Sequence, residues 1–458
     1  MGRRRTPILC AALLVAAGCG GGPKTTSRTT AAATAPAPAL GAAGDCGAPS
    51  GFRCLAFTVP LHRRGPRRGD DTTLTLRAAV QDVPAAPRGD LLLLAGGPGQ
   101  AGIPFAARLA ARLRGATRGY RLVVVDQRGT GANALRCGAL QREAGTSDLA
   151  VPSERAVRAC GEALGAARDA YATADTVADL EALRRALKRR RWVVGGISYG
   201  TFVAQRLALA HPATVSKLVL DSVVPQAGAE LLLRDPQRAV GRVLRDVCGA
   251  RCVGDLRALL RRDGPLGPLL LDALVARSIG VPRLDGAGAA LHAAVTTGPR
   301  PLEAFLRVDH AAPPARFSSG LHAATLCADS PAPWPGGPSA TAAVRTSAAD
   351  AQQARMGPRA TDPFPVSTAF AQGLFATCRA WPRTAAPPAP DPLARIAAPA
   401  LLLAGDRDLS TPLEWARGQA AAMAHARVVV VRGAGHSILS RERGTTGRDA
   451  LRAFLAAR

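Results

Sequence analysis

The chain has 458 residues, and 47% of them are hydrophobic, which is enough for a large catalytic domain with a substantial buried core. Its formal net charge of +26 would by itself suggest nucleic acid or an anionic surface as a partner. Nearly all of this charge is arginine, in a chain also rich in alanine, glycine and proline, and all four residue types have GC-rich codons. Because aromatic residues make up only 4%, few side chains could stack on bases, and we expect no nucleic acid partner.

The N-terminus is typical of an export signal. Three arginines at positions 3–5 precede an apolar stretch, residues 8–17, that is too short to span a bilayer as a stable anchor. Residues 16–19 resemble a bacterial lipobox, in which Cys19 would carry the lipid, although alanine stands where leucine is usual. We therefore expect a signal peptide over residues 1–19, a flexible linker over residues 20–45 and a lipid anchor, with simple secretion as the alternative.

The cysteine count agrees with an oxidising compartment. Without Cys10 and Cys19 eight cysteines remain, and sequence alone does not fix how an even set pairs. We expect local disulfides: Cys46–Cys54, Cys137–Cys160, Cys248–Cys252 and Cys327–Cys378. A metal site at the third pair is a poor alternative, because no histidine or second cysteine pair lies near it at zinc spacing. We expect neither a metal nor another cofactor.

The predicted elements alternate between strand and helix along the first half of the chain. Two opening strands come first, then apolar strands with glycine-rich exits, and then a helix with an apolar face. Their ranges are Cys54–Pro60, Thr72–Val80, Leu91–Ala95, Leu122–Asp126 and Thr176–Arg190. This alternation predicts a mostly parallel sheet with helices on both faces. After Asp221 the strand signals cease for about 170 residues.

A G-x-S-x-G pentapeptide, residues 196–200, follows the apolar run Trp192–Val194 and opens a helix-like segment, Thr201–Ala210. Strand, sharp turn and helix are the parts of a nucleophile elbow, which exposes a serine hydroxyl above a sheet. The pentapeptide alone is common, and Ser198 could be an ordinary turn serine. With this context we predict that Ser198 is the nucleophile.

An acid and a base should follow the serine in that order. The apolar run Pro399–Gly405 ends in a loop with Asp408, and Val428–Val431 ends in a glycine-flanked loop with His436. We predict Asp408 as the acid, with Asp406 of the same loop as the alternative, and His436 as the base. The imidazole would take the serine proton, and the carboxylate would fix its tautomer.

The third requirement is a site for the oxyanion. Residues 91–94 are leucines that run into Ala95 and then Gly96–Gly99, a loop without side chains that would block a backbone N–H. We expect the amides of Gly97 and Tyr199 to face the oxyanion, and loss of one such donor typically slows a reaction about 100-fold to 1,000-fold.

These segments together resemble the secreted tripeptidyl aminopeptidase and prolyl aminopeptidase relatives within the α/β-hydrolases. The resemblance covers the chain from about Cys46 onward and rests on its oxyanion loop, a D-Q-R-G-x-G turn, the elbow, an acid loop and two cysteine-containing segments. These are residues 96–99, 126–131, 196–200, 405–412, 324–329 and 378–382. Ala95 departs from the histidine that many prolyl aminopeptidases carry there, which favours the tripeptidyl branch.

The resemblance implies an α/β-hydrolase fold in which a mainly helical cap interrupts the core. We expect core over residues 46–224, cap over 225–390 and core again over 391–458. The cap would cover the serine and exclude water. Asp329 and Glu230 could bind a substrate ammonium group, as acidic cap residues do in that family, although a solvated surface charge is the blander interpretation. Asp126 and Arg128 fit bracing of the oxyanion loop better than a part in the chemistry.

Our hypothesis from the sequence is a serine exopeptidase, at the cell surface or secreted, that removes short fragments from peptides with free N-termini through an acyl-enzyme on Ser198. A carboxylic-ester hydrolase with the same triad is the first alternative, because fold does not settle function. A non-catalytic envelope lipoprotein on a hydrolase scaffold is the second. We expect a monomer that meets the membrane only through a lipid anchor.

Overall fold

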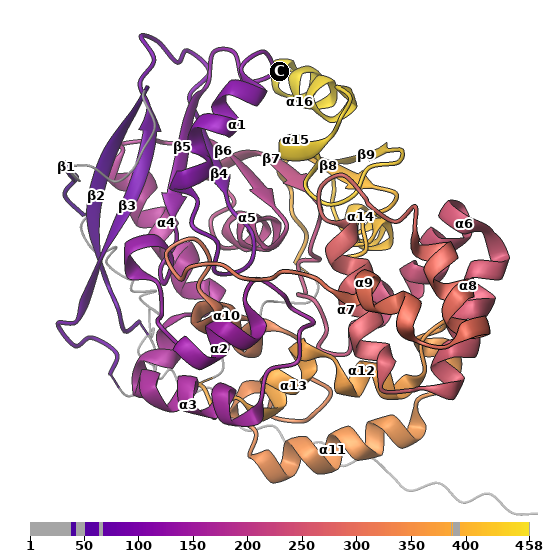
Figure 1. Ribbon diagram of the computed structural model, residues 1–458. Helices are drawn as coiled ribbons and strands as arrows, with labels where there is room; N and C mark the ends of the chain where they lie inside the picture. Colours follow the sequence, from indigo (N-terminus) through magenta and orange to yellow (C-terminus); the bar gives the residue numbers. More distant parts are fainter. Residues whose placement is uncertain (1–37, 43–50, 64–66, 386, 388–393, 458) are drawn as a thin grey trace, which may run out of the picture. The chain divides into compact units, whose positions relative to one another are not determined.

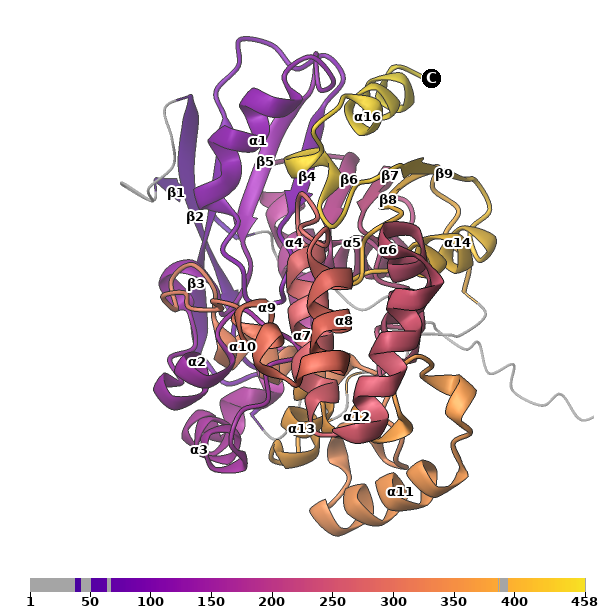
Figure 2. The same cartoon turned by 45° about the vertical axis from the view of Figure 1, so that its right-hand side comes forward.

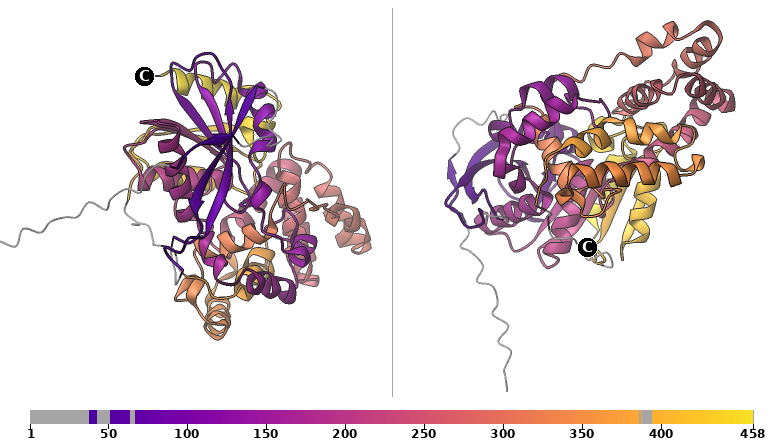
Figure 3. Two further views of the ribbon diagram at one scale, coloured as in Figure 1. Left: turned by 90° about the vertical axis from the view of Figure 1, so that its left-hand side faces the viewer. Right: turned by 90° about the horizontal axis from the view of Figure 1, so that it is seen from below.

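A nine-stranded sheet runs through the described part of the chain (Figure 1). The computed structural model describes residues 38–42, 51–63, 67–385, 387 and 394–457. The strand order is β1-β2-β3-β5-β4-β6-β7-β8-β9; β1, β2, β3 and β5 pair antiparallel, and all later pairs are parallel. The strands are β1 (Gly41–Ala42), β2 (Phe52–Pro60), β3 (Thr73–Gln81), β4 (Asp90–Leu94), β5 (Arg121–Asp126), β6 (Trp192–Ile197), β7 (Val215–Asp221), β8 (Ala400–Gly405) and β9 (Ala426–Val431). Seen from the side, the strands cross one another, which is the usual twist of such a sheet (Figure 3).

The central strands are continuous apolar runs because helices cover both of their faces. Leu91, Leu93 and Val124 point to one face, where α1, α15 and α16 pack. Leu92 and Leu94 point to the other face, where α4, α5 and α14 pack. The expected strands are confirmed with shifts of one or two residues at their ends. These helices are α1 (Ala106–Leu113), α4 (Thr173–Ala186), α5 (Tyr199–Ala210), α14 (Leu413–Ala421), α15 (Ile438–Arg441) and α16 (Thr446–Ala456).

The described residues between β7 and β8 form helices and contribute no strand to the sheet. Among them α6 lies beside α7 and α8 (Figure 2). The helices α2 and α3 come before β6 in the chain, yet they share a hydrophobic cluster with this helical group. The group comprises α2 (Gly138–Ala144), α3 (Glu154–Leu164), α6 (Arg234–Arg262, broken at Gly249), α7 (Leu266–Ser278), α8 (Ala287–Thr297), α9 (Glu303–Leu306), α10 (Ser319–Asp329), α11 (Ala342–Arg355), α12 (Val366–Ala371) and α13 (Gly373–Ala380).

Three disulfides hold this helical group. Cys137–Cys160 joins the start of α2 to α3, Cys248–Cys252 spans the break in α6, and Cys327–Cys378 joins α10 to α13. These are three of the four expected pairs. Cys46 and the expected lipidation site Cys19 lie outside the described residues. None of the described helices is long and apolar enough to cross a membrane.

Candidate active site

Ser198 occupies the sharp turn between β6, which ends at Ile197, and α5, which begins at Tyr199. Its backbone has φ 57° and ψ −129°, a left-handed conformation that is costly for a residue with a side chain. The backbone N–H of Ser198 donates a hydrogen bond to the Asp221 carbonyl oxygen, 2.9 Å away. The neighbouring strand β7 thereby helps to hold the strained turn.

The glycines around Ser198 are required by contact distances. A Cβ on Gly196 would lie 2.1 Å from the carbonyl oxygen of Gly200, and one on Gly200 would lie 2.5 Å from that of Leu94. A Cβ on Gly96 would lie 2.8 Å from the Cβ of Ser198. The elbow and the end of β4 therefore approach more closely than any larger residue would permit.

His436 and Asp408, from the loops after β9 and β8, meet directly. The Nδ1 atom of His436 lies 2.9 Å from Oδ2 of Asp408, and both side chains are buried. The same Asp408 oxygen accepts a hydrogen bond from the Thr411 hydroxyl at 2.7 Å, and its other oxygen accepts from the backbone N–H groups of Ser410 and Thr411. With Nδ1 facing a carboxylate, Nε2 is the nitrogen that can accept a proton.

The pKa of His436 reflects this setting. Burial alone would lower the pKa, but the Asp408 carboxylate and, more weakly, Asp221 outweigh it and hold the pKa above its ordinary value, while Arg441 acts in the opposite direction. Burial raises the pKa of Asp221 to about 6, although Ile438 and Leu439 donate backbone hydrogen bonds to its carboxylate. Asp221 is therefore a second buried carboxyl group, besides Asp408, next to the loop that contains His436.

The histidine loop is also held from the helical group, at the end of α7. The backbone N–H of His436 donates to the Ser278 carbonyl oxygen at 3.0 Å, and Gly280 N–H donates to the His436 carbonyl oxygen at 3.1 Å. The buried hydroxyl of Ser278 accepts a hydrogen bond from Leu409 N–H at 3.1 Å, next to Asp408. One short segment of the helical group thus contacts both the acid loop and the base loop.

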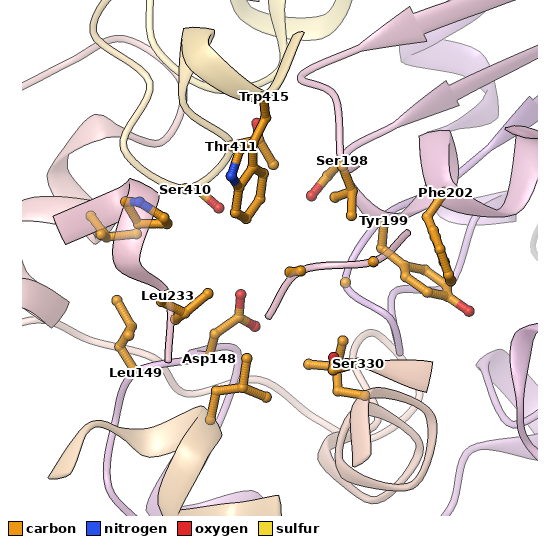
Figure 4. A pocket seen from close by; sticks show the side chains of 18 of the residues that line it. Asp148, Leu149, Ser198, Tyr199, Phe202, Leu233, Ser330, Ser410, Thr411 and Trp415 are labelled. Atoms are coloured by element: carbon orange, nitrogen blue, oxygen red, sulfur yellow. The ribbon is translucent and has the colours of Figure 1, made fainter. Parts of the chain in front are cut away.

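Two adjoining cavities meet at Ser198. The first cavity is lined largely by apolar residues, including Phe202, Leu233 and Trp415, and also by two acidic residues, Asp148 and Asp329. Figure 4 shows the Ser198 hydroxyl and the Asp148 carboxylate both pointing into it. The second cavity is lined by Ser198 and His436 together. The proposed nucleophile and the proposed base therefore line one cavity.

Gly97 lines both cavities beside Ser198, and Tyr199 is the first residue of α5, where a helix provides no acceptor for the backbone N–H. Gly97 has φ 100°, and a Cβ there would lie 2.8 Å from the backbone nitrogen of Gly99. The loop thus depends on glycine at this position. That these two amides bind an oxyanion remains a prediction.

The two acidic residues expected to bind substrate lie in different surroundings. Asp329 is a lining residue of the first cavity, and its carboxylate accepts hydrogen bonds from the backbone N–H and the hydroxyl of Thr173, at 2.7 and 2.6 Å. Glu230 pairs with Arg234 and is absent from the described lining of that cavity. Of the two, only Asp329 is brought to the Ser198 side of the site.

Asp148 and His322, which sequence reasoning missed, connect the cavity to the oxyanion loop. Nδ1 of His322 lies 2.8 Å from the Pro98 carbonyl oxygen, and Nε2 lies 2.6 Å from the Asp148 carboxylate. Burial alone would lower the pKa of His322, but Asp148 and Pro98 outweigh it and raise the pKa. The histidine lies about two turns before Asp329 on α10, so its helix was identifiable, but no local pattern marks its partners.

Asp126 and Arg128 have bracing contacts. The Asp126 carboxylate accepts from the backbone N–H groups of Gly102 and Ile103, at 2.8 and 2.9 Å, just beyond the oxyanion loop. Arg128 is fully buried and makes a two-pronged ion pair with Asp179.

No group of three or more His, Cys, Asp or Glu side chains among the described residues could hold a metal ion.

Two family models match parts of the chain. Residues 91–247 match the α/β-hydrolase fold model, and residues 362–457 match the model of TAP-like proteins. A probable proline iminopeptidase of Streptomyces coelicolor is 32% identical over 142 residues, 31% of this chain and 35% of the relative. A tripeptidyl aminopeptidase of Streptomyces lividans is 29% identical over 199 residues, 40% of this chain and 37% of the relative. The match thus spans little more than a third of either relative.

A solved proline iminopeptidase from Mycobacterium smegmatis aligns over 87% of this chain and 97% of its own, with 17% identity and a TM-score of 0.44. The match over residues 91–247, the mostly parallel sheet and the helices on both of its faces identify the fold. The protein therefore has the α/β-hydrolase fold, and its C-terminal part is similar to TAP-like proteins.

Proposed function

We propose that the protein is a serine exopeptidase that releases short fragments from the free N-termini of peptides. Two things support this: the carboxylate–imidazole pair that shares a cavity with Ser198, and relatives named tripeptidyl aminopeptidase and proline iminopeptidase. The observation that carries the peptidase form is the pair of carboxylates in the first cavity, because an ammonium group needs such partners and an ester does not.

In the proposed reaction, the Ser198 hydroxyl attacks the scissile carbonyl while His436 takes its proton. The oxyanion of the tetrahedral intermediate would accept hydrogen bonds from the amides of Gly97 and Tyr199. His436 then gives its proton to the leaving amine, the C–N bond breaks, and the fragment remains on Ser198 as an ester. Water, activated by His436, hydrolyses that ester and releases the fragment as a carboxylate.

A carboxylic-ester hydrolase is the second candidate, and the apolar remainder of the first cavity favours it, since an acyl chain would fit among Phe202, Leu233 and Trp415. We further propose that the enzyme acts outside the cytoplasm, because three disulfides persist best in an oxidising compartment. A lipid anchor at Cys19 and a monomeric state remain part of the proposal.

The test uses chromogenic peptides with a free or an acetylated N-terminus, beside a short-chain nitrophenyl ester. We expect cleavage of the free-amine peptides only, its loss in Ser198→Ala, and fragment length from product masses. Asp329→Asn should lower kcat/KM for these peptides about tenfold or more, while the matched Glu230→Gln should not. Ester turnover without peptide cleavage would favour the esterase, and inactivity on every substrate would favour a non-catalytic scaffold.

A further inference from the structure

A third cavity adjoins the site at the histidine loop. We call it the arginine cleft. It shares His436, Ser437 and Arg441 with the second cavity, which in turn shares Ser198, Gly97 and Asp148 with the first. The three spaces therefore form a series, with the reacting atoms of the proposed triad in the middle. The cleft has a volume of about 600 Å³, within the range of ligand sites.

The charged side chains that line the first cavity are acidic, whereas most of those that line the arginine cleft are basic. The first cavity has two carboxylates, Asp148 and Asp329, and no basic side chain among its described lining residues. The arginine cleft is lined by four arginines against two carboxylates. The four are Arg407, Arg432, Arg441 and Arg443.

Among the described residues, only Arg407 of the four cleft arginines makes an ion pair, with Asp246, and the cleft carboxylate of Asp285 pairs with none of them. Glu442 is buried and already accepts hydrogen bonds from Arg448 and from the backbone of Gly447, so it does not serve the cleft arginines. Within the described parts of the chain, Arg432, Arg441 and Arg443 are exposed and pair with no carboxylate. Three guanidinium groups are therefore available to an anion.

Of the four cleft arginines, Arg441 is the one that also lines the second cavity, together with Ser198 and His436. Its charge also acts on His436, where it opposes the rise in the pKa caused by Asp408. A negative group bound at Arg441 would therefore lie close to His436, which gives its proton to the leaving amine in the proposed reaction. Guanidinium groups suit this task, since their N–H donors match both oxygens of a carboxylate.

We propose that Arg441 and the arginine cleft bind negative charge on the leaving part of the substrate, so that the preferred substrates are short peptides with a carboxylate just beyond the scissile bond. This inference rests on the proposed function, which places the substrate amine in the first cavity. A peptide then lies with its positive end near Asp148 and Asp329 and its negative end near Arg441. Each charged end of the peptide then lies beside side chains of the opposite charge.

The carboxylate could be the C-terminus of a short peptide or an acidic side chain, and four peptides separate these sources. All have the same free N-terminal fragment and the same cleaved bond. In the first pair the leaving part ends either in a carboxylate or in an amide. In the second pair it ends in an amide and has either Glu or Gln directly after the cleaved bond. We expect kcat/KM to be about fivefold higher for each carboxylate than for its neutral counterpart in low salt. In about 1 M salt the difference should shrink.

The variants are Arg441→Gln and Arg443→Gln, with Arg355→Gln as the matched control, because Arg355 is an exposed arginine at the end of α11, away from all three cavities. The carboxylate preference should largely disappear in Arg441→Gln and persist in the control. Equal rates for all four peptides in the unaltered protein, or an undiminished preference in Arg441→Gln, would overturn the inference and leave the proposed function standing. Failure to cleave any of the four would overturn both.

Discussion

The backbone N–H of His436 donates a hydrogen bond to the carbonyl oxygen of Ser278, so the end of helix α7 fixes the position of the proposed catalytic base. The same serine accepts a hydrogen bond from Leu409 N–H through its hydroxyl, beside Asp408. The part of the helical group that lies between β7 and β8 therefore supports the acid and base loops.

Ser278→Ala tests this support. The substitution leaves Leu409 N–H buried without its acceptor, which typically costs about 1–3 kcal/mol, and it loosens the acid loop. We expect a lower midpoint of thermal unfolding and a fall in kcat of about tenfold with little change in KM. Thr361→Val is the control, because Thr361 is a buried hydroxyl of the helical group that bonds only to the Phe364 carbonyl in the contacts described. An equal loss of kcat in the control would contradict a specific role for Ser278.

Ser198→Gly should be more stable than Ser198→Ala, although both lack the nucleophile. The φ of 57° at this position strains any residue with a Cβ, by about 1–3 kcal/mol, and glycine is free of this strain. We expect glycine to raise the free energy of unfolding above that of the alanine variant by about 1 kcal/mol, measured in urea. If alanine were the more stable of the two, the backbone at Ser198 would be unstrained.

The pH dependence of kcat/KM should move in opposite directions in two variants. His436 must be neutral to accept the serine proton, so activity rises with pH through its pKa. Asp221 helps to raise that pKa, and Asp221→Asn should shift the acid limb to lower pH. Arg441 opposes the rise, and Arg441→Gln should shift the limb to higher pH. The profiles would be recorded with an uncharged leaving group, and shifts of the same sign in both variants would contradict the electrostatic account.

Among the three described disulfides, Cys327–Cys378 should contribute the largest single stabilisation of the helical group. It closes a loop with a sequence separation of 51 residues, and the chain-entropy model assigns such a bridge about 4 kcal/mol. The Cys248–Cys252 bridge has a separation of 4 and should contribute about half as much. Replacing each pair by serine and comparing the thermal midpoints checks this, and an equal loss in both variants would argue against the loop-length explanation.

The sequence correctly placed the proposed triad residues in turns and loops that follow strands. Ser198, Asp408 and His436 each come directly after an apolar run, so a parallel sheet brings them to one edge, and the glycines at 196 and 200 mark the tight turn. Thr411 was within the identified acid loop, although its hydrogen bond to Asp408 was not foreseen.

The contacts made by the helical group could not be read in the same way. Ser278, Asp148 and His322 reach the site through the packing of helices distant in sequence, for which no short pattern exists. Glu230 is the opposite case. The sequence suggested that it binds substrate, but its carboxylate forms an ion pair with the neighbouring Arg234. Which side chains of the helical group reach the site depends on tertiary contacts, and the local sequence does not reveal those contacts.

The neighbouring strands β7 and β8 have a consequence for how the protein acquires activity. They pair in the sheet although about 180 residues of chain separate Asp221 from Ala400. Ser198 is synthesised before that long excursion, whereas Asp408 and His436 follow it. A contact between segments so far apart forms slowly, because a large loop must close first. The proposed nucleophile therefore remains without its proposed partners until β8 and β9 have been made and have joined the sheet, so the proposed hydrolysis would begin only at the last stage of folding.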